Sequence, residues 1–538
     1  MPGGYLNIIS LGNGNVFLTG NPSKTFFKVT YAKYTNFGMQ KFRLDYEGLR
    51  DLRLAEESKF TFKIKRYADL LMDTYLVVNL PDIWSPVWEP SEQTGEQWSP
   101  YDFKWIENIG VQMISQIELV CGSVTLQRYS GQYLAAMIER DFKGLKKQLI
   151  NDMTGNVPEL TNPANWAART NGTPSMSNVY PTATYVQGTA GAEPSIRGRT
   201  IYIPLNTWFS LDSRCAFPLV SLQYQEFQIN VTLRPVQELI QVRDVFNSTQ
   251  NFPYVRPDLR LNQFQLYRFL QTPPSTDLST ANYENQVQTW NSDVHLLATY
   301  CFLSNSEQEL FAAQDQIYLV KDIYEYNFLN ILGTSRVNLI STTNMVANWM
   351  WFFQRNDAFL RNEWSNYSNW TYNNVLPDNL VLDPSSGLFV SGPFSPANQK
   401  EIMETMAIVL SGDYREQTLP SGVFNYIEKY IRTAQYGKEG LYCYNFCLNT
   451  NPFDYQPSGA MNMSKFKNIE LEFTTYQPPF DTTGANFDIT CDEFGNPISV
   501  TSKPAWALYT YNYNLHVMEE RYNILSFIGG NCGMMYAR

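Results

Sequence analysis

The chain has 538 residues and a net charge of −11, from 40 Lys and Arg against 51 Asp and Glu. This acidic balance argues against direct, sequence-independent binding of nucleic acid, because that binding needs an excess of basic side chains to neutralise phosphates. Tyr and Phe are abundant, with 35 and 33 residues, which favours the pleated, half-buried surfaces of β-sheets.

The cysteines and the first residues indicate an intracellular chain. Seven cysteines, an odd number, are scattered through strand-like contexts, unlike the disulfide framework of a secreted protein. The first residues show neither the basic nor the apolar region of a signal peptide, and no apolar run approaches the ~20 residues of a membrane span. We therefore expect core thiols and a soluble chain made in the cytosol.

Residues 1–25 are predicted to form an N-terminal arm. Its short apolar pieces, which contain Leu6, Ile8 and Phe17, are separated by the turn signal Gly12-Asn-Gly14. Such a segment has little to bury on its own, so we expect it to pair with another surface or lie across it.

The remainder is predicted to be strands separated by turns, with two helices. Apolar residues at helical spacing predict helices over 131–142 and 304–316. Strands are expected over 38–46, 60–64, 74–80, 111–120, 200–205, 224–233, 262–269 and 294–302, and then over 317–326, 337–340, 349–354, 405–410, 440–447, 468–474 and 505–517. The non-periodic stretches 151–199, 244–260, 271–291, 357–400 and 477–502 are expected to be long loops.

The two halves of the chain repeat each other. Strict alternation places Phe227, Ile229 and Val231 on one face of a half-buried strand, which follows a short apolar run and a turn containing Pro. The same succession of apolar run, turn and alternating strand returns roughly 240 positions later. A second pair of similar segments occurs in the same order in both halves. The matched pairs are 201–205 with 441–447, 227–233 with 469–473, and 117–122 with 407–412. We interpret the chain as a duplicated all-β unit.

Several motifs occur in a fixed order along nearly the whole chain. They are Leu18-Thr-Gly-Asn-Pro22, Phe217-Pro-Leu-Val-Ser-Leu-Gln-Tyr-Gln-Glu226, the segment 300–312, Gln456-Pro-Ser-Gly459 and Tyr511-Asn-Tyr-Asn514. Together they resemble motifs of the major capsid proteins of nucleocytoplasmic large DNA viruses. Gln225 stands where that family commonly has His, and the segment 300–312 lacks the family's usual Asp and Arg.

This resemblance implies an all-β fold of two consecutive eight-stranded jelly rolls (a double jelly roll) with long inserted loops and a few short helices. The arm, 1–25, would precede a first roll, 26–303, a connector, 304–316, and a second roll, 317–538.

The resemblance also implies a structural function. Three chains would form a capsomer with six lobes, and capsomers would tile an icosahedral shell. The implied partners are the protein itself, neighbouring capsomers, minor capsid or penton proteins and, through other proteins, an inner membrane layer. The protein would be made in the host cytoplasm and end in the virion.

Two groups of side chains are expected to line contacts between subunits. One is in the arm and contains Leu6, Ile8 and Phe17. The other is an aromatic loop with Trp364, Tyr367, Trp370 and Tyr372. For this loop we favour the competing interpretation, which is packing against the chain's own roll.

Residues with catalytic potential are sparse. The two histidines, His295 and His516, each stand alone in the last predicted strand of a roll, and structural roles are the preferred interpretation. The sequence contains no phosphate-binding loop and no nucleophile elbow. We therefore predict no catalytic, cofactor or metal site.

Asn-X-Ser/Thr triplets occur in predicted loops at Asn171, Asn247, Asn366 and Asn369, which makes these residues hypothetical glycan acceptors. A chain without a secretory signal would not meet the host's usual glycosylation machinery.

Two alternative functions stay open at this point. One is a β-sandwich protein that binds carbohydrate or a receptor through loop aromatics, and the less favoured one is a polysaccharide-active enzyme.

Overall fold

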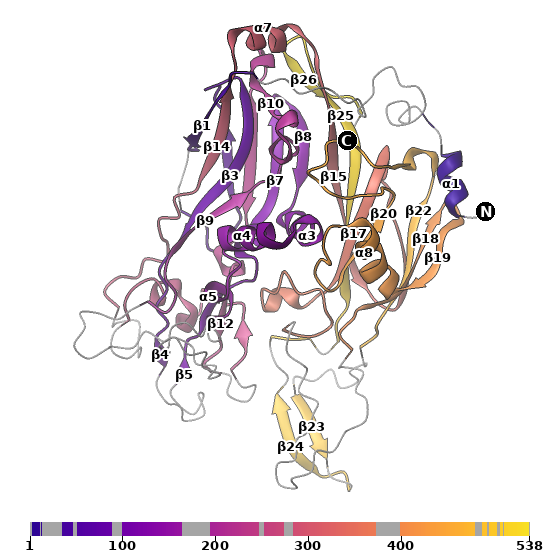
Figure 1. Ribbon diagram of the computed structural model, residues 1–538. Helices are drawn as coiled ribbons and strands as arrows, with labels where there is room; N and C mark the ends of the chain where they lie inside the picture. The colour runs from indigo at the N-terminus through magenta and orange to yellow at the C-terminus, as the bar shows by residue number, and fades with distance from the viewer. Residues whose placement is uncertain are drawn as a thin grey trace.

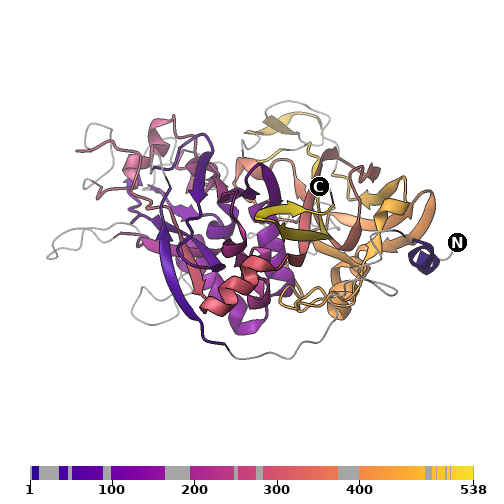
Figure 2. The ribbon, with the colours of Figure 1, turned by 90° about the horizontal axis from the view of Figure 1, so that it is seen from above.

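A computed structural model describes most of the chain as two β-rolls that lie side by side (Figures 1 and 2). The described residues are 3–10, 12, 35–46, 51–88, 99–163, 194–246, 252–273, 283–372, 399–478, 487–491, 494–502, 506–508 and 510–536.

The first roll consists of two antiparallel sheets. One sheet has the order β1 (Gly38–Leu44), β14 (His295–Phe302), β3 (Leu70–Leu80) and β9 (Arg199–Pro204), and the short β10 (Phe217–Pro218) also pairs with β3. The other has the order β2 (Ser58–Lys63), β11 (Phe227–Leu233), β7 (Ile114–Cys121) and β8 (Val124–Tyr129). This crossing order is that of a jelly roll.

The second roll has the same strand order. Its first sheet runs β15 (Gln316–Ile331), β25 (Tyr513–Ile528), β17 (Met345–Arg355) and β20 (Leu441–Asn445), with β21 (Met461–Asn462) on β17 and β26 (Asn531–Met534) on β25. Its second sheet runs β16 (Thr334–Asn338), β22 (Ile469–Thr475), β18 (Met403–Leu410) and β19 (Asp413–Pro420). The predicted duplication and the double jelly-roll fold are confirmed.

Short extra sheets extend the rolls at the lower end of Figure 1. They are β4 (Val87–Trp88) with β5 (Ser99–Pro100), β6 (Phe103–Trp105) with β12 (Ile240–Arg243) and β13 (Tyr254–Val255), and β23 (Phe487–Cys491) with β24 (Pro497–Ser502). Strand β13 and the β23–β24 pair lie in stretches that the sequence predicts to be loops, and β12 ends beside one of them. Strands β4, β5 and β6 lie between residues 81 and 110, where the sequence predicts no element.

Most helices belong to the first roll or join the two rolls. They are α1 (Gly3–Ile9), α2 (Ile109–Gln112), α3 (Gly131–Asp141), α4 (Gly144–Thr154), α5 (Pro158–Thr161), α6 (Trp208–Leu211), α7 (Asn305–Ala313) and α8 (Glu428–Arg432), and α8 continues a π-helical turn, Val423–Ile427. Helix α7 bridges the tops of the rolls in Figure 1, at the position of the predicted connector. In the described part of the chain, no helix is both long enough and apolar enough to cross a membrane.

Apolar alternation positions the central strands. In β11 and β22 every second side chain is buried and the others are half-buried, as expected for strands that cover a core on one face. Strand β17 differs because all eleven of its residues are buried. An antiparallel strand that is buried on both faces needs a second layer outside its own roll, and the first roll supplies that layer.

Some predicted elements were wrong. Residues 262–269 form two 3₁₀ turns instead of a strand, because the buried Arg268 donates to Asn262 O at 2.7 Å and closes the chain locally. Residues 109–112 form α2, so β7 begins later than expected. Strands β8 and β19 and helix α4 had not been predicted, and β25 extends eleven residues beyond the predicted end at 517.

Candidate functional site

The contact between the two rolls is the candidate functional site, because it decides how the two similar units are arranged. Strand β8 and helix α3 of the first roll lie against the outward face of β15, β25 and β17. Gln127 Nε2 on β8 donates to Lys321 O on β15 at 3.0 Å. The backbone N–H of Ser130 donates to Glu325 Oε1 at 2.7 Å. The same Ser130 caps α3, since its hydroxyl oxygen accepts from Tyr133 N.

A buried ion cluster lies at the centre of this contact. The guanidinium of Arg140, 1 % exposed, donates to Asp141 Oδ2 at 2.6 Å, Glu520 Oε1 at 2.8 Å and Asn348 Oδ1 at 2.8 Å. Tyr133 OH donates to the same Glu520 oxygen at 2.9 Å. Arg140 therefore connects a helix of the first roll to two strands of the second.

Lys321 on β15, Asn348 on β17 and Thr450 in the loop after β20 complete the cluster. Lys321 Nζ lies 3.4 Å from Glu520 Oε2, and Asn348 Nδ2 donates to that oxygen at 2.9 Å. Thr450 donates its hydroxyl to Asp141 at 2.6 Å. Burial raises the pKa of Glu520, but the charges of Arg140 and Lys321 outweigh burial and lower it to about 2. Glu520 is therefore an anion at neutral pH, and each of its oxygens has a cationic partner.

Apolar side chains surround the cluster. Met350, Phe352, Met518 and Cys443 project from the second roll, yet they belong to the same continuous apolar cluster as the core of the first roll, and none is more than 1 % exposed. The inner faces of β17 and β25 contribute to the separate core of the second roll. The core of the first roll thus extends across the contact onto the outward face of the second roll, which keeps a core of its own.

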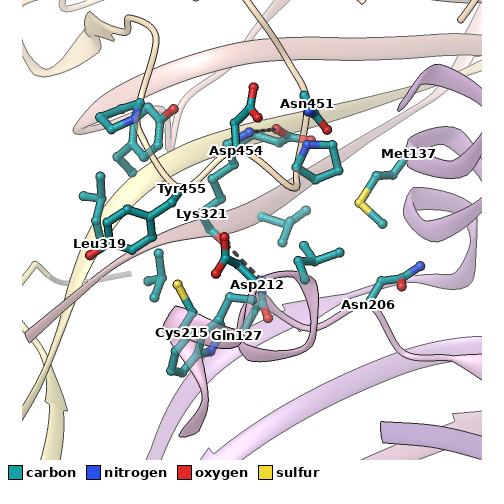
Figure 3. A pocket seen from close by; sticks show the side chains of 18 of the residues that line it. Gln127, Met137, Asn206, Asp212, Cys215, Leu319, Lys321, Asn451, Asp454 and Tyr455 are labelled. Carbon is teal, nitrogen blue, oxygen red and sulfur yellow. Dashed lines mark hydrogen bonds and ion pairs between the residues drawn. The ribbon is translucent and has the colours of Figure 1, made fainter. Parts of the chain in front are cut away.

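A small cavity of about 90 Å³ lies beside the ion cluster (Figure 3). Its wall carries Gln127, Asn206 and Asp212 from the first roll and Leu319 and Lys321 from the second. Its volume is well below the ~300 Å³ at which small-molecule sites begin, so we interpret it as a gap in packing.

The aromatic loop after β17 packs against the chain's own first roll. Trp364 Nε1 donates to Glu238 O at 2.9 Å, and the Arg234 guanidinium lies 4.3 Å from the Trp364 ring centre. Tyr372 OH donates to Tyr254 O at 2.6 Å. This loop follows a strand of the second roll, so its contacts with Glu238, Arg234 and Tyr254 form a second connection between the rolls.

The other two loop aromatics are also packed by this chain. Tyr367, 5 % exposed, stacks on Phe352 with ring centres 4.1 Å apart. Trp370 is half-buried, and Lys400 Nζ lies 5.0 Å from its ring centre.

The structure describes two of the four hypothetical glycan acceptors, and both are buried. Asn366 Nδ2 donates to Trp370 O at 2.8 Å, and Asn369 Nδ2 donates to Gln399 O at 2.9 Å. A glycan on either nitrogen would have to break these bonds and open the loop. Asn171 and Asn247 lie outside the described residues.

The N-terminal arm is described over residues 3–10 and at 12. Helix α1 lies on β19 at the outer side of the second roll (Figure 1), and Leu6, 5 % exposed, enters the core of that roll. Tyr5, Ile8 and Ile9 point outward and are 52–68 % exposed. Phe17 lies outside the described residues.

The histidines occupy equivalent strands but do not form a joint site. His295 begins β14, where its Nδ1 lies 2.7 Å from Asp293 O. His516 in β25 stacks on Phe352, and its Nδ1 lies 2.7 Å from Asn327 Oδ1. Burial and the nearby Arg234 lower the pKa of His516 to about 4. Within the described ranges, no three His, Cys, Asp or Glu side chains are grouped as a metal site would require.

Sequence reasoning missed Arg140, Glu520 and their partners. A signal was present in the run Glu519-Glu520-Arg521, which interrupts an apolar stretch. Charged residues that continue a strand between apolar neighbours are rarely buried unless paired, so they mark a contact between elements.

Both halves of the chain match models of one protein family. The family model for the major capsid protein N-terminus matches residues 25–303, and the model for the large eukaryotic DNA virus major capsid protein matches residues 307–533. The chain is 25 % identical to the major capsid protein of Phaeocystis pouchetii virus over 508 residues, which cover 88 % of this chain and 92 % of that protein.

Solved structures show the same fold. A chain of the PBCV-1 virus capsid has 17 % identity and a TM-score of 0.57, with 96 % of this chain and 100 % of that chain covered. The Faustovirus major capsid protein has 13 % identity and a TM-score of 0.60, with 93 % and 92 % covered. These relatives are structural proteins, not enzymes.

The buried cluster predicts the effect of removing its central cation. Arg140→Met should destabilise the fold by about 3–5 kcal/mol, because Glu520 and Asp141 would be left buried beside an apolar side chain. Denaturant titration would measure this loss, with Arg128→Met on the exposed face of β8 as the matched control. The double variant Arg140→Met/Glu520→Gln should recover part of the loss. If Arg140→Met were as stable as the control Arg128→Met, a central role for the cluster would be contradicted.

His516 predicts a pH dependence. Its folded pKa of about 4 is below the ordinary value of 6.5, so the unfolded chain binds the proton more readily. The histidine's contribution to stability is therefore present above pH 6.5 and is lost as pH falls toward 4. His516→Gln keeps a partner for Asn327 but cannot titrate, so its stability should fall less than that of the wild type between pH 7 and 4.5. If the thermal stabilities of the wild type and His516→Gln changed in parallel with pH, His516 would have no such effect.

Proposed function

Because the chain belongs to the major capsid proteins of large eukaryotic DNA viruses and is a structural component of the virion shell, we propose that three copies associate into a capsomer with six similar lobes. The observation that carries the proposal is the identical strand order of the two rolls within one chain. Three such chains would present six jelly rolls, which suit a hexagonal cell of an icosahedral lattice.

The packing of the rolls supports a role as a building block. A jelly roll protects most of its strand edges, and this protection opposes uncontrolled edge-to-edge aggregation when a β-protein is made in bulk in the host cytoplasm. The ion cluster and the shared interior fix the two rolls in one arrangement. Every copy therefore offers the same outer surfaces to its neighbours, as a closed assembly requires.

Contacts beyond the capsomer would use the surfaces outside the rolls. We include neighbouring capsomers, minor capsid or penton proteins and, through other proteins, an inner membrane layer among the partners. The N-terminal arm is our candidate for one such contact, because α1 is anchored by Leu6 and presents Tyr5, Ile8 and Ile9 to solvent. Three exposed apolar side chains on one short helix are typical of a surface that a partner covers.

The capsomer proposal predicts a discrete mass. The purified protein should elute as one species of three times the chain mass of 62.0 kDa, measured by light scattering after gel filtration. Electron microscopy of that species should show six lobes. A monodisperse monomer at micromolar concentration would contradict spontaneous trimer formation.

The arm proposal predicts a defect in shell assembly. Deletion of residues 1–25 should leave the capsomer mass unchanged but reduce the yield of closed shells by an order of magnitude or more. The substitution Ile8→Asp should act in the same direction without loss of thermal stability, since Ile8 is 68 % exposed. Unchanged shell yield in both variants, counted by electron microscopy, would remove the arm from the contact.

A further inference from the structure

The hairpin formed by β25 and β26 reaches from the second roll to the first. Strand β26 lies between the rolls at the top of Figure 1, beside β8. At the turn of the hairpin, the carbonyl oxygen of Gly530 accepts from Gln223 N at 3.0 Å and from Tyr224 N at 3.3 Å. A β-carbon added to Gly530 would stand 3.0 Å from the Gln223 side chain, and the φ of +81° also favours glycine. The hairpin is therefore held tightly against the first roll.

This contact brings together two cysteines from different rolls. Cys121 ends β7 of the first roll, and Cys532 is the second residue of β26. The side-chain oxygen of Gln225 accepts from Cys121 Sγ at 3.4 Å and from the backbone N–H of Cys532 at 2.7 Å, so one amide group contacts both residues. The two thiols are also hydrogen-bonded to each other. Two residues that are far apart in the sequence thus meet side chain to side chain.

The pair is enclosed by apolar side chains. Cys121 is 0 % and Cys532 4 % exposed, and both belong to the apolar cluster that forms the core of the first roll. Both are free thiols. In the part of the chain that the structure describes, no third His, Cys, Asp or Glu joins them to make a metal site. A single buried cysteine packs as a small apolar residue, but two thiols in contact can also form a covalent bond.

The two thiols differ in reactivity. The hydrogen bond between them and the nearby Arg66 lower the pKa of Cys121, whereas the same hydrogen bond and burial raise the pKa of Cys532. The thiolate is the nucleophile in thiol–disulfide exchange, so Cys121 is the better nucleophile of the pair.

The position of β26 gives a route to the buried pair. The strand has four residues and, among the described strands, pairs with β25 alone. The flanking residues Ile528 and Met535 are 52 % and 49 % exposed. A short strand at the surface opens at a lower free energy than the strands of the core. Local opening of β26 would therefore admit a small oxidant without unfolding either roll.

We propose that Cys121 and Cys532 are a disulfide site, which stays reduced in a reducing compartment and forms a covalent bond between β7 and β26 when the chain meets an oxidant of the glutathione disulfide class. Cytosolic thiols are kept reduced, whereas the surface of a released virion is a setting in which disulfides persist. A shell component passes from the first setting to the second. The inference goes beyond the proposed capsomer and does not depend on how many chains it contains.

The reaction proceeds in two exchange steps. The Cys121 thiolate attacks one sulfur of glutathione disulfide, whose S–S bond breaks, and one glutathione thiolate leaves. The Cys532 thiolate then attacks the Cys121 sulfur of this mixed disulfide and releases the second glutathione thiolate. The two cysteines lose two electrons, which reduce glutathione disulfide to two glutathione molecules. The two cysteine protons end on the glutathione sulfurs.

The test uses the full chain, purified under reducing conditions and then incubated with glutathione disulfide without denaturant. The remaining thiols are blocked with N-ethylmaleimide during denaturation, and the chain is digested for mass spectrometry. Most chains should yield a peptide pair that joins Cys121 to Cys532, and dithiothreitol should separate it. Wild-type chains that keep both thiols free, or that join either cysteine mainly to a different one, would overturn the proposal.

Serine variants show whether the bond is specific. Cys121→Ser and Cys532→Ser should each abolish the joined peptide pair. Cys301→Ser is the matched control, because Cys301 is 5 % exposed and its Sγ contacts Phe302 O at 3.9 Å. The control should keep the joined pair. Loss of the pair in the control as well would contradict a dedicated site.

Thermal unfolding measures what the bond does. A disulfide that closes a long loop restricts the unfolded chain, so oxidised wild type should unfold about 3 °C or more above reduced wild type. Cys532→Ser should have the same midpoint in both conditions. Equal midpoints for oxidised and reduced wild type would overturn the stabilising role of the bond. Both measurements can be made on single chains, so a failure to form trimers is a separate outcome.

Discussion

The arrangement of the whole molecule depends on the pairing of Arg140 with Glu520. A guanidinium and a carboxylate that are almost fully buried lose several kcal/mol of hydration each, and only close, well-oriented partners return that energy. Here the partners come from different rolls, so the charges are satisfied only when the rolls meet in one orientation. Hydrogen bonds from Tyr133 and Asn348 and the ion pair with Lys321 complete the contacts of Glu520 and restrict that orientation further. Apolar contacts supply attraction across the interface, and the ion cluster selects the geometry.

This constraint explains why the second roll departs from a simple sandwich. An antiparallel sheet commonly leaves one face to solvent, but β17 is buried throughout and most of β25 is buried as well. The outward side chains Met350, Phe352 and Met518 complete the core of the first roll, and the loop that carries Trp364 strengthens the same contact on one side. The two rolls therefore pack against each other through one continuous apolar contact, although each has its own jelly-roll topology.

The sequence predicts this fold where one physical rule dominates a segment. Strict alternation identified β11 and β22, and the repeated order of runs and turns revealed the duplication. Prediction from the sequence failed for the segments whose structure is set by tertiary contacts. Strand β19 is mostly exposed and shows no apolar alternation. The far half of β25 is interrupted by Glu519, Glu520 and Arg521. Glu519 pairs with Arg521 in the same strand, and the other partners of this run lie on other elements. Arg140 and Glu520 are separated by 380 positions, and no local pattern links two such residues. For the aromatic loop the sequence left two kinds of contact open, and its partners on the first roll, such as Glu238 and Tyr254, follow from no local pattern.

The position of Glu520 also bears on how the chain can fold during synthesis. Strand β25 is the partner of both β15 and β17, and it is made long after the first roll has left the ribosome. Until then, Arg140 lacks its distant carboxylate, and the apolar wall that Met350, Phe352 and Met518 complete remains open to water. A nascent chain in this state exposes apolar surface and strand edges, the features that make folding intermediates prone to aggregate. Completion of the first roll is thus coupled to a strand of the second, and the N-terminal half cannot finish folding ahead of the C-terminal half.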